Sequence, residues 1–313
     1  MAAMNPLEPS LQQWSNPFSR YLAATRPAFL GVTLAGALIG LGTAHFDGVP
    51  IDLAKAVLTL LFALVAHAGA NVVNDYYDAL NGSDAGNQSR LYPFTGGSRF
   101  IQNGVLGLHE TRRLGYGLLA AVVPAGLWLA AHSTPGLIGI GLAGLLVAWA
   151  YSAPPLQLMA RGAGEAAIVA GWLLVVLGTD LVQRGGFAAR PLVAGLPFAL
   201  LVAAILYLNQ FPDAAADAAA GKRTLVVRLG VPRARWGYAA LAAAAYLWLA
   251  GALMLGALPA AAALALLPAA LSLRAGGQLL RDAARPERLA PAIKATIAAA
   301  HLHGLLMALA LAL

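Results

Sequence analysis

Carboxylate and carboxamide side chains gather at the end of one long apolar stretch. Asn71, Asn74, Asp75 and Asp78 are spaced three and four residues apart, and Asp84 follows shortly afterwards. Residues three and four apart share a face of an α-helix, so we expect the first four to form one stripe that directs oxygen atoms at one volume. Gly82 can take the left-handed conformation that commonly ends a helix, and Asp84 could then return toward the same volume.

A second polar cluster follows about half a chain later. Asn209, Asp213 and Asp217 lie one helical turn apart, and only alanines separate the two aspartates, which leaves room for a ligand. Pro212 has no backbone N–H, so a kink or a fresh helix start is expected there.

Hard oxygen ligands without histidine or cysteine favour Mg²⁺, which commonly joins carboxylates to phosphates. Gathered without cations, the five aspartates would repel one another strongly in a low-dielectric setting. Basic residues follow each cluster, as a diphosphate would need. They are Arg90 and Arg99 after the first cluster, and Lys222 and Arg223 after the second.

The rest of the sequence is typical of a membrane protein. Hydrophobic residues make up 60% of it and charged residues 11%, against about 25% charged in a typical soluble domain. Several apolar runs reach the ~18–20 residues that cross a bilayer as a helix, and they do not alternate as the strands of a membrane β-barrel do. Without cysteine, disulfide and thiolate chemistry are excluded. We expect an all-α polytopic bundle with about nine transmembrane helices, at residues 21–45, 54–80, 113–132, 135–152, 164–182, 191–211, 236–257, 258–273 and 291–313.

Basic residues predict the orientation of this bundle. With the N-terminus in the cytoplasm, all of the 20 lysines and arginines except Lys55, Arg184 and Arg190 fall on the inner side, which is the bias that sets topology. The net charge of +7 therefore reflects orientation rather than nucleic-acid binding. We expect a multi-pass protein of the inner (cytoplasmic) membrane, with a cytoplasmic tail at residues 1–19, one transmembrane domain at residues 20–313, and both aspartate clusters at the cytoplasmic face.

Structural roles are the alternative for several of these residues. Aspartates at helix ends are often caps, but two such clusters on the same face of a membrane, each preceded by asparagine, favour a functional site. His67 lies one turn before Asn71 and is either a packed core histidine or part of an acceptor pocket. Among the aromatic residues, Phe94 and Tyr151 fit a cavity wall best.

These motifs resemble the UbiA superfamily of intramembrane aromatic prenyltransferases. The resemblance rests on Asn74-Asp-Tyr-Tyr-Asp78 with Gly-Ser-Asp84, on Asp213-x-x-x-Asp217 with Gly-Lys-Arg-Thr-Leu, and on Tyr151-Ser-Ala-Pro-Pro-Leu. The 1,4-dihydroxy-2-naphthoate polyprenyltransferase branch is the most similar. The resemblance implies helices around a central cavity, a lipid-facing tunnel for an isoprenoid tail, and two Mg²⁺ ions between the aspartates and an allylic polyprenyl diphosphate. It implies metal ligands at Asn74, Asp78, Asp84, Asp213 and Asp217.

Three positions depart from the family pattern. Gly82 stands where many members carry the third acid of the first motif, so Asp84 must replace it. Pro212 stands where the naphthoate branch often has arginine, and Gln157 stands where lysine is common. The last two differences remove contacts for a diphosphate or an acceptor carboxylate and leave the acceptor open.

The predicted reaction is electrophilic aromatic prenylation. We assign catalysis to Asp75, Asp78 and Asp213, and substrate binding to Asn71, Asn74, Arg90, Arg99, Tyr151, Asn209, Lys222 and Arg223. Another aromatic acceptor, such as 4-hydroxybenzoate or homogentisate, is an alternative. A cation-coupled transporter is a second alternative and would place its acids near the centres of the spans.

Overall fold

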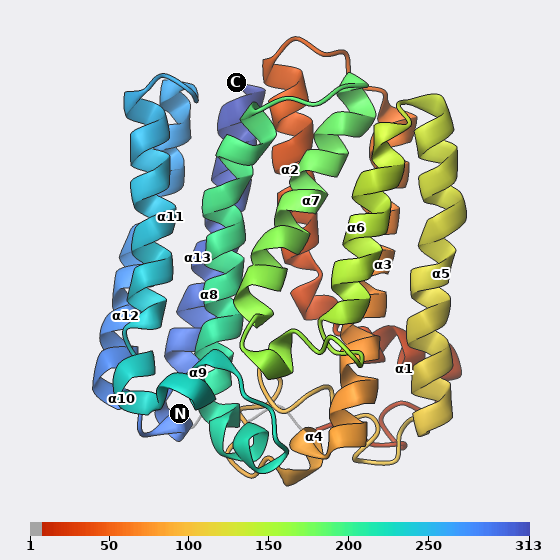
Figure 1. The fold of residues 1–313 in the computed structure, drawn as a ribbon, viewed down its shortest axis with the longest axis vertical. Helices are drawn as coiled ribbons and strands as arrows, with labels where there is room; N and C mark the ends of the chain where they lie inside the picture. The colour runs from red at the N-terminus through yellow and green to blue at the C-terminus, as the bar shows by residue number, and fades with distance from the viewer. Residues whose placement is uncertain (1–7) are drawn as a thin grey trace.

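A computed structural model describes residues 8–313, and this part of the chain is helical without any strand. Long helices stand side by side and alternate in direction (Figure 1). They are α2 (Gly31–Phe46), α3 (Leu53–Asn81), α5 (Leu108–His132), α6 (Gly136–Ala150), α7 (Gly164–Arg184), α8 (Arg190–Ala219), α11 (Gly237–Met254), α12 (Ala269–Asp282) and α13 (Ala290–Ala312). Short helices connect them: α1 (Pro17–Ala24), η1 (Pro27–Phe29), α4 (Ser83–Gly86), η2 (Met159–Arg161), α9 (Leu225–Leu229), α10 (Val231–Ala234), η3 (Ala260–Leu266) and η4 (Pro286–Arg288).

Within residues 8–313, eight helical segments are long and apolar enough to cross a membrane, and α6 is a shorter apolar helix. The predicted all-α membrane bundle is therefore confirmed. The expected break within residues 236–273 is also present, because α11 ends at Met254 and η3 begins after Pro259.

Three predicted boundaries were wrong. The first span begins at Pro27, because α1 is a separate helix and Arg26, with φ of 57°, turns the chain between them. This short helix also crosses the boundary expected between residues 19 and 20; residues 1–7 of the expected tail lie outside the described residues. At the other two boundaries, α8 does not end at residue 211 but continues to Ala219, and the span expected to end at residue 273 continues to Asp282.

Pro212 lies inside α8, so of the two expected outcomes, a kink or a fresh helix start, the fresh start does not occur. A proline removes only one hydrogen bond from the helix, and neighbouring contacts hold this turn. The buried amide of Gln210 donates to Glu165 and accepts from the backbone N–H of Val226 at 3.2 Å. The helix can therefore carry both Asp213 and Asp217 in register.

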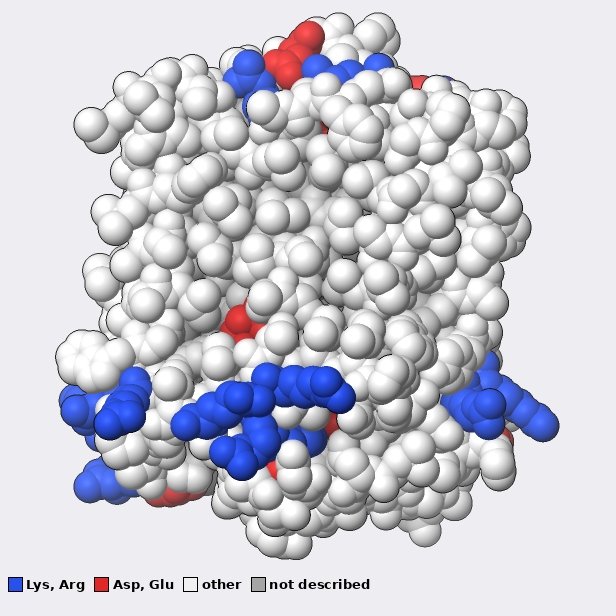
Figure 2. All heavy atoms as spheres, in the orientation of Figure 1, with Lys and Arg blue, Asp and Glu red and all other residues white. Residues whose placement is uncertain are grey.

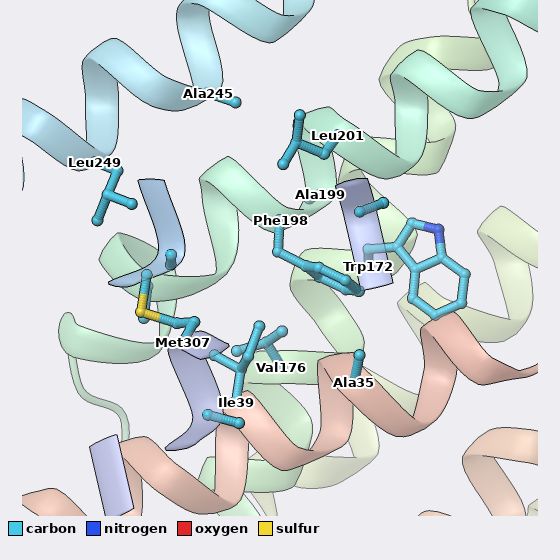
Figure 3. Close-up of a cluster of buried hydrophobic side chains, with 14 of the residues drawn as sticks. Ala35, Ile39, Trp172, Val176, Phe198, Ala199, Leu201, Ala245, Leu249 and Met307 are labelled. Carbon is cyan, nitrogen blue, oxygen red and sulfur yellow. The ribbon is translucent and has the colours of Figure 1, made fainter. Parts of the chain in front are cut away.

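Close helix packing forms the core between α2, α7, α8, α11 and α13. Figure 3 shows Trp172 and Val176 of α7 beside Phe198 of α8 and Ile39 of α2. Helices in a membrane associate largely through close packing, because lipid is as apolar as their side chains. Small residues at the interface permit this close approach. A Cβ on Gly40 would lie 2.4 Å from the carbonyl oxygen of Val176, so that crossing requires glycine.

Most of the charged side chains gather at the two ends of the bundle. On the face in Figure 2, basic side chains gather at the end where α4, α9 and α10 lie, a smaller mixed group marks the opposite end, and few charges lie between them. The opposite end includes a clamp made of four residues. Asp180, which is fully buried, accepts two hydrogen bonds from Arg184 at 2.7 and 2.8 Å. Asp47 then pairs with Arg184 at 2.8 Å and with Arg190 at 2.6 Å, which joins α2 to α7 and α8.

Removing Asp180 should therefore destabilise the bundle. Loss of one partner of a buried ion pair typically costs about 3–5 kcal/mol because the other charge is left uncompensated. We expect Asp180→Ala to lower the unfolding temperature in detergent by several degrees. Asp282→Ala is the control, because its pairs with the exposed Arg285 and Arg288 are 3.8 and 3.9 Å long. Equal effects of the two variants would contradict the role of the clamp.

Candidate active site

A cavity of about 400 Å³ lies between α3, α5, α6, α7 and α8. Its charged end is formed where α3 and α8 end, beside α4 (Figure 1). Asp78, Asp84, Asp213, Asp217 and Lys222 all line that end. Residues from both sequence clusters, more than a hundred positions apart, thus share one volume.

The stripe on α3 reaches the cavity as expected for Asn71, Asn74 and Asp78. The amide of Asn74 donates to Asp78 and to the hydroxyl of Ser152, both at 3.0 Å. Asn71 donates to the backbone carbonyl of Thr25 at 3.1 Å. These bonds orient the stripe before any ligand binds.

Asp75 does not line the cavity, contrary to the expectation that it shares this volume. It pairs with Arg26 and accepts from the backbone N–H of Ser98 at 3.3 Å. Successive residues of a helix are about 100° apart, so Asp75 lies at the edge of the stripe, where Arg26 holds it. The contact with Arg26 was not foreseen, because sequence alone does not relate residues 49 positions apart.

Asp84 returns to the cavity, as the position of Gly82 predicted. Gly82 ends α3 in the left-handed region, at φ of 80°, and the one-turn helix α4 follows. The Asp84 side chain is buried, and its Oδ2 atom has no hydrogen-bond partner within residues 8–313. Burial, together with the nearby carboxylates of Asp78 and Asp75, raises the pKa of Asp84 well above its usual value. A cation beside it would reverse that effect.

Gly97 lies directly against this carboxylate. A Cβ at Gly97 would lie 2.1 Å from Oδ2 of Asp84, and φ is 75°. Gly97→Ala should therefore displace Asp84 and strongly reduce activity. Gly104→Ala is a matched control, because Gly104 lies in the same loop at φ of 67° and its added Cβ would meet nothing within 4 Å. Comparing initial rates at matched expression tests this; equal losses would mean that backbone strain alone is responsible.

The acids of α8 complete the charged end. Asp213 accepts a short hydrogen bond from the amide of Asn87, and Asn209 donates to the carbonyl of Phe94 at 3.3 Å. Phe94 and Tyr151 both line the cavity, as expected from their positions, and so does His67. Asn87 was missed in the sequence, where it is one of several polar residues in an irregular loop.

Lys222 lies between the two clusters. Its ammonium is 3.1 Å from Asp78 and 3.1 Å from Asp217. Burial alone would lower the pKa of Lys222, but these carboxylates outweigh it and raise the pKa above its usual value, so the side chain stays charged. Backbone bonds hold its loop, including Arg223 N–H to the carbonyl of Ala160 at 2.8 Å. Within residues 8–313, no three carboxylate or imidazole groups are close enough to hold a metal ion unaided.

The other predicted basic contacts do not line the cavity. Arg90 and Arg99 instead bind Glu8, at 2.7 and 3.4 Å. Arg99 also donates to the backbone carbonyl of Asp84 at 2.5 Å, and Arg223 is exposed. Arg26, which in the sequence is only one of the many basic residues expected on the inner side, lines the cavity as Lys222 does. Glu8 was also missed, because nothing in the sequence links the first residues to this loop.

Glu8 therefore ties the N-terminal segment to the loop that covers the charged end. We expect Glu8→Ala to release this loop and to accelerate tryptic cleavage after Arg90 and Arg99, measured by mass spectrometry of limited digests in detergent. Glu287→Ala, an exposed acid in η4, is the control. An unchanged cleavage rate in Glu8→Ala would show that the loop is held without this contact.

The family of the chain is given by comparison with known proteins. Residues 29–299 match the UbiA prenyltransferase family. The chain belongs to this family. A 1,4-dihydroxy-2-naphthoate octaprenyltransferase from Mycobacterium leprae is 31% identical, over 72% of this chain and 74% of the relative. One from Escherichia coli is 29% identical, over 71% and 72%. The resemblance noted in the motifs is thereby confirmed.

Solved structures agree on the fold. A UbiA homolog from Aeropyrum pernix K1 matches with a TM-score of 0.64 and 20% identity, covering 88% of this chain and 96% of that one. A UbiA homolog from Archaeoglobus fulgidus bound to DMAPP and Mg²⁺ matches with a TM-score of 0.62 and 18% identity, covering 90% and 98%. The chain is thus an integral membrane prenyltransferase with the UbiA fold.

Proposed function

We propose that this enzyme transfers a polyprenyl group from an allylic polyprenyl diphosphate to an aromatic acceptor, 1,4-dihydroxy-2-naphthoate, in menaquinone biosynthesis. One observation carries the proposal: four carboxylates, Lys222 and Arg26 line the charged end of a cavity whose remaining lining is mostly apolar. Such a cavity suits a substrate with a charged head and a hydrocarbon tail. The names of the similar relatives support this donor and acceptor.

The residues present fit Mg²⁺. Oδ2 of Asp84, Oδ2 of Asp217 and Oδ1 of Asn209 are buried oxygen atoms without partners within residues 8–313. Mg²⁺ usually takes one or two carboxylates and completes its octahedron with water and phosphate, so a preformed cage is not required. We infer two ions, one held by Asn74, Asp78 and Asp84 and one by Asp213 and Asp217. The homolog bound to DMAPP and Mg²⁺ supports the metal.

Different groups in the cavity then assist different steps of the reaction. Bound Mg²⁺ would supply charge neutralisation for the departing diphosphate. Lys222 donates hydrogen bonds to the diphosphate as the allylic C–O bond breaks and the electron pair leaves with oxygen. Apolar side chains shield the allylic cation from water until the electron-rich ring attacks it. The ring then loses CO₂ from the substituted carbon, or a proton from an unsubstituted one, and regains aromaticity.

The remaining predicted residues take supporting roles in this proposal. Asn71, Tyr151 and Asn209 contact substrate along the cavity wall. Asp75 orients Arg26. Arg90 and Arg99 act one step away, by holding the loop over Asp84, and Arg223 lies at the exposed mouth.

Orientation also belongs to the proposal. We infer an inner-membrane protein with its N-terminus and charged end in the cytoplasm and one transmembrane domain at residues 20–313. At the end opposite the charged end of the cavity, Lys55, Arg184 and Arg190 are paired with acids, so that end carries little net charge. The other lysines and arginines make the proposed cytoplasmic end strongly positive, as the positive-inside bias requires. A transporter is disfavoured because the acids lie at the ends of α3 and α8 rather than at their centres.

Replacement of either aspartate cluster should abolish catalysis. We expect Asp78→Ala and Asp213→Ala to eliminate Mg²⁺-dependent transfer from labelled polyprenyl diphosphate while the proteins still elute as folded species in detergent. Asp52→Ala, at the exposed start of α3, should keep full activity. Turnover in either site variant would contradict the mechanism.

A panel of acceptors tests the substrate assignment. Membranes that contain the enzyme are incubated with a mixture of donors and with 1,4-dihydroxy-2-naphthoate, 4-hydroxybenzoate or homogentisate, and products are identified by mass spectrometry. We expect product from the naphthoate. If only 4-hydroxybenzoate or homogentisate gives a product, that compound is the acceptor instead of the naphthoate. Solute uptake into proteoliposomes without any product would favour a transporter.

A further inference from the structure

The cavity beyond its charged end has two chemically different walls. The wall formed by α5 and α6 is apolar, and includes Gly126, Gly141 and Gly144, where an added Cβ would meet nothing within 4 Å. The wall formed by α3 and α7 carries His67 and Trp172. A hydrocarbon tail matches the first wall, whereas a polar ring nitrogen needs a partner that a tail cannot provide.

Hydrogen bonding determines which nitrogen of His67 carries the proton. The hydroxyl of Thr33 lies 2.8 Å from Nδ1 of His67, and Thr33 is fully buried. This is the only side-chain hydrogen bond of Thr33 within residues 8–313, so its O–H must donate to Nδ1 to avoid a buried unsatisfied donor. A neutral imidazole then carries its proton on Nε2.

Nε2 of His67 has no protein partner within residues 8–313. His67 is only partly buried and lines the cavity. Trp172 stands edge-on to its ring, with centroids 5.1 Å apart, and Trp172 in turn packs against Phe198 at 6.3 Å (Figure 3). The imidazole is thus held by Thr33 on one side and Trp172 on another, which leaves the Nε2–H available to a ligand.

The depth of His67 matches an acceptor rather than the diphosphate. His67 precedes Asp78 by eleven positions, which corresponds to about 16 Å along a helix axis. Asn71 lies between them on the same wall. An attacking ring carbon must approach the allylic carbon to about 3–3.5 Å, so a bound ring would lie just beyond the diphosphate. A ring that extends deeper into the cavity would have its far edge toward His67.

We propose that Nε2–H of His67 donates a hydrogen bond to a ring-bound oxygen of the aromatic acceptor, and that Thr33 is a positioning residue that fixes this tautomer. The inference rests on the proposed function, since it requires an aromatic acceptor with hydroxyl or carboxylate oxygens. It adds a specificity-determining residue on the acceptor side of the reaction.

Kinetics with both substrates test the assignment. His67→Leu should raise the KM for 1,4-dihydroxy-2-naphthoate about tenfold, as expected for loss of one hydrogen bond to substrate, and leave the KM for the polyprenyl diphosphate unchanged. His67→Gln, which retains an N–H donor, should recover part of the loss. His301→Leu is the control, because His301 lies in α13 and does not line the cavity.

Acceptor analogues identify the oxygen. 1-Hydroxy-2-naphthoate lacks the 4-hydroxyl group, and 1,4-dihydroxynaphthalene lacks the carboxylate. With the wild-type enzyme, the analogue that lacks the contacted oxygen should have a kcat/KM about tenfold below that of 1,4-dihydroxy-2-naphthoate. In His67→Leu the same analogue should lose nothing further. Thr33→Val should raise the acceptor KM by a smaller factor with little change in kcat.

Nitrogen-15 NMR of labelled histidine gives a readout that does not depend on turnover. The His67 signal, assigned by its loss in His67→Gln, should show the Nε2–H tautomer, and Thr33→Val should shift it toward a mixture. A changed KM for the diphosphate in His67→Leu, an unchanged acceptor KM, or an Nδ1–H tautomer would each overturn the inference. Absence of any prenyl transfer by the wild-type enzyme would instead refute the proposed function.

Discussion

Buried negative charge at the end of an apolar cavity is the constraint on which this structure depends. Asp78 and Asp217 come from helices that are far apart in the sequence, and both lie 3.1 Å from the ammonium of Lys222. Carboxylates so placed repel one another unless cations lie among them. The buried carboxylates that Lys222 neutralises also create a place where metal and diphosphate can bind.

The charged side chains at the two ends of the bundle are neutralised to different extents. At one end, Asp180, Arg184, Asp47 and Arg190 neutralise one another through short direct bonds. At the other end, buried oxygens such as Oδ2 of Asp84 have no partner within residues 8–313. The first arrangement stabilises the helices, and the second leaves binding capacity for substrate. One end with paired charges and one end with unpartnered oxygens fit an enzyme that binds the charged group of its substrate at one end of the bundle.

Irregular segments complete the charged end of the cavity. The loop between α4 and α5 places Asn87 on Asp213 and Gly97 against Asp84, and Glu8 holds this loop through Arg90 and Arg99. Such contacts depend on backbone conformations that hydropathy and helical periodicity do not encode. Arg90 and Arg99 therefore resembled diphosphate ligands in the sequence but serve as supports in the structure, while Arg26 resembled a topological charge but lines the cavity.

The sequence by itself determined the all-helical membrane fold, both aspartate clusters and the family, because long apolar runs and helical spacing are local properties. It also predicted the turn at Gly82, since left-handed backbone is a local demand for glycine. Only the tertiary structure decided that Asp75 turns to Arg26, that α8 continues through Pro212, and that His67 faces the cavity beside Thr33. Those outcomes depend on which side chains meet across helices, and packing between distant segments decides that.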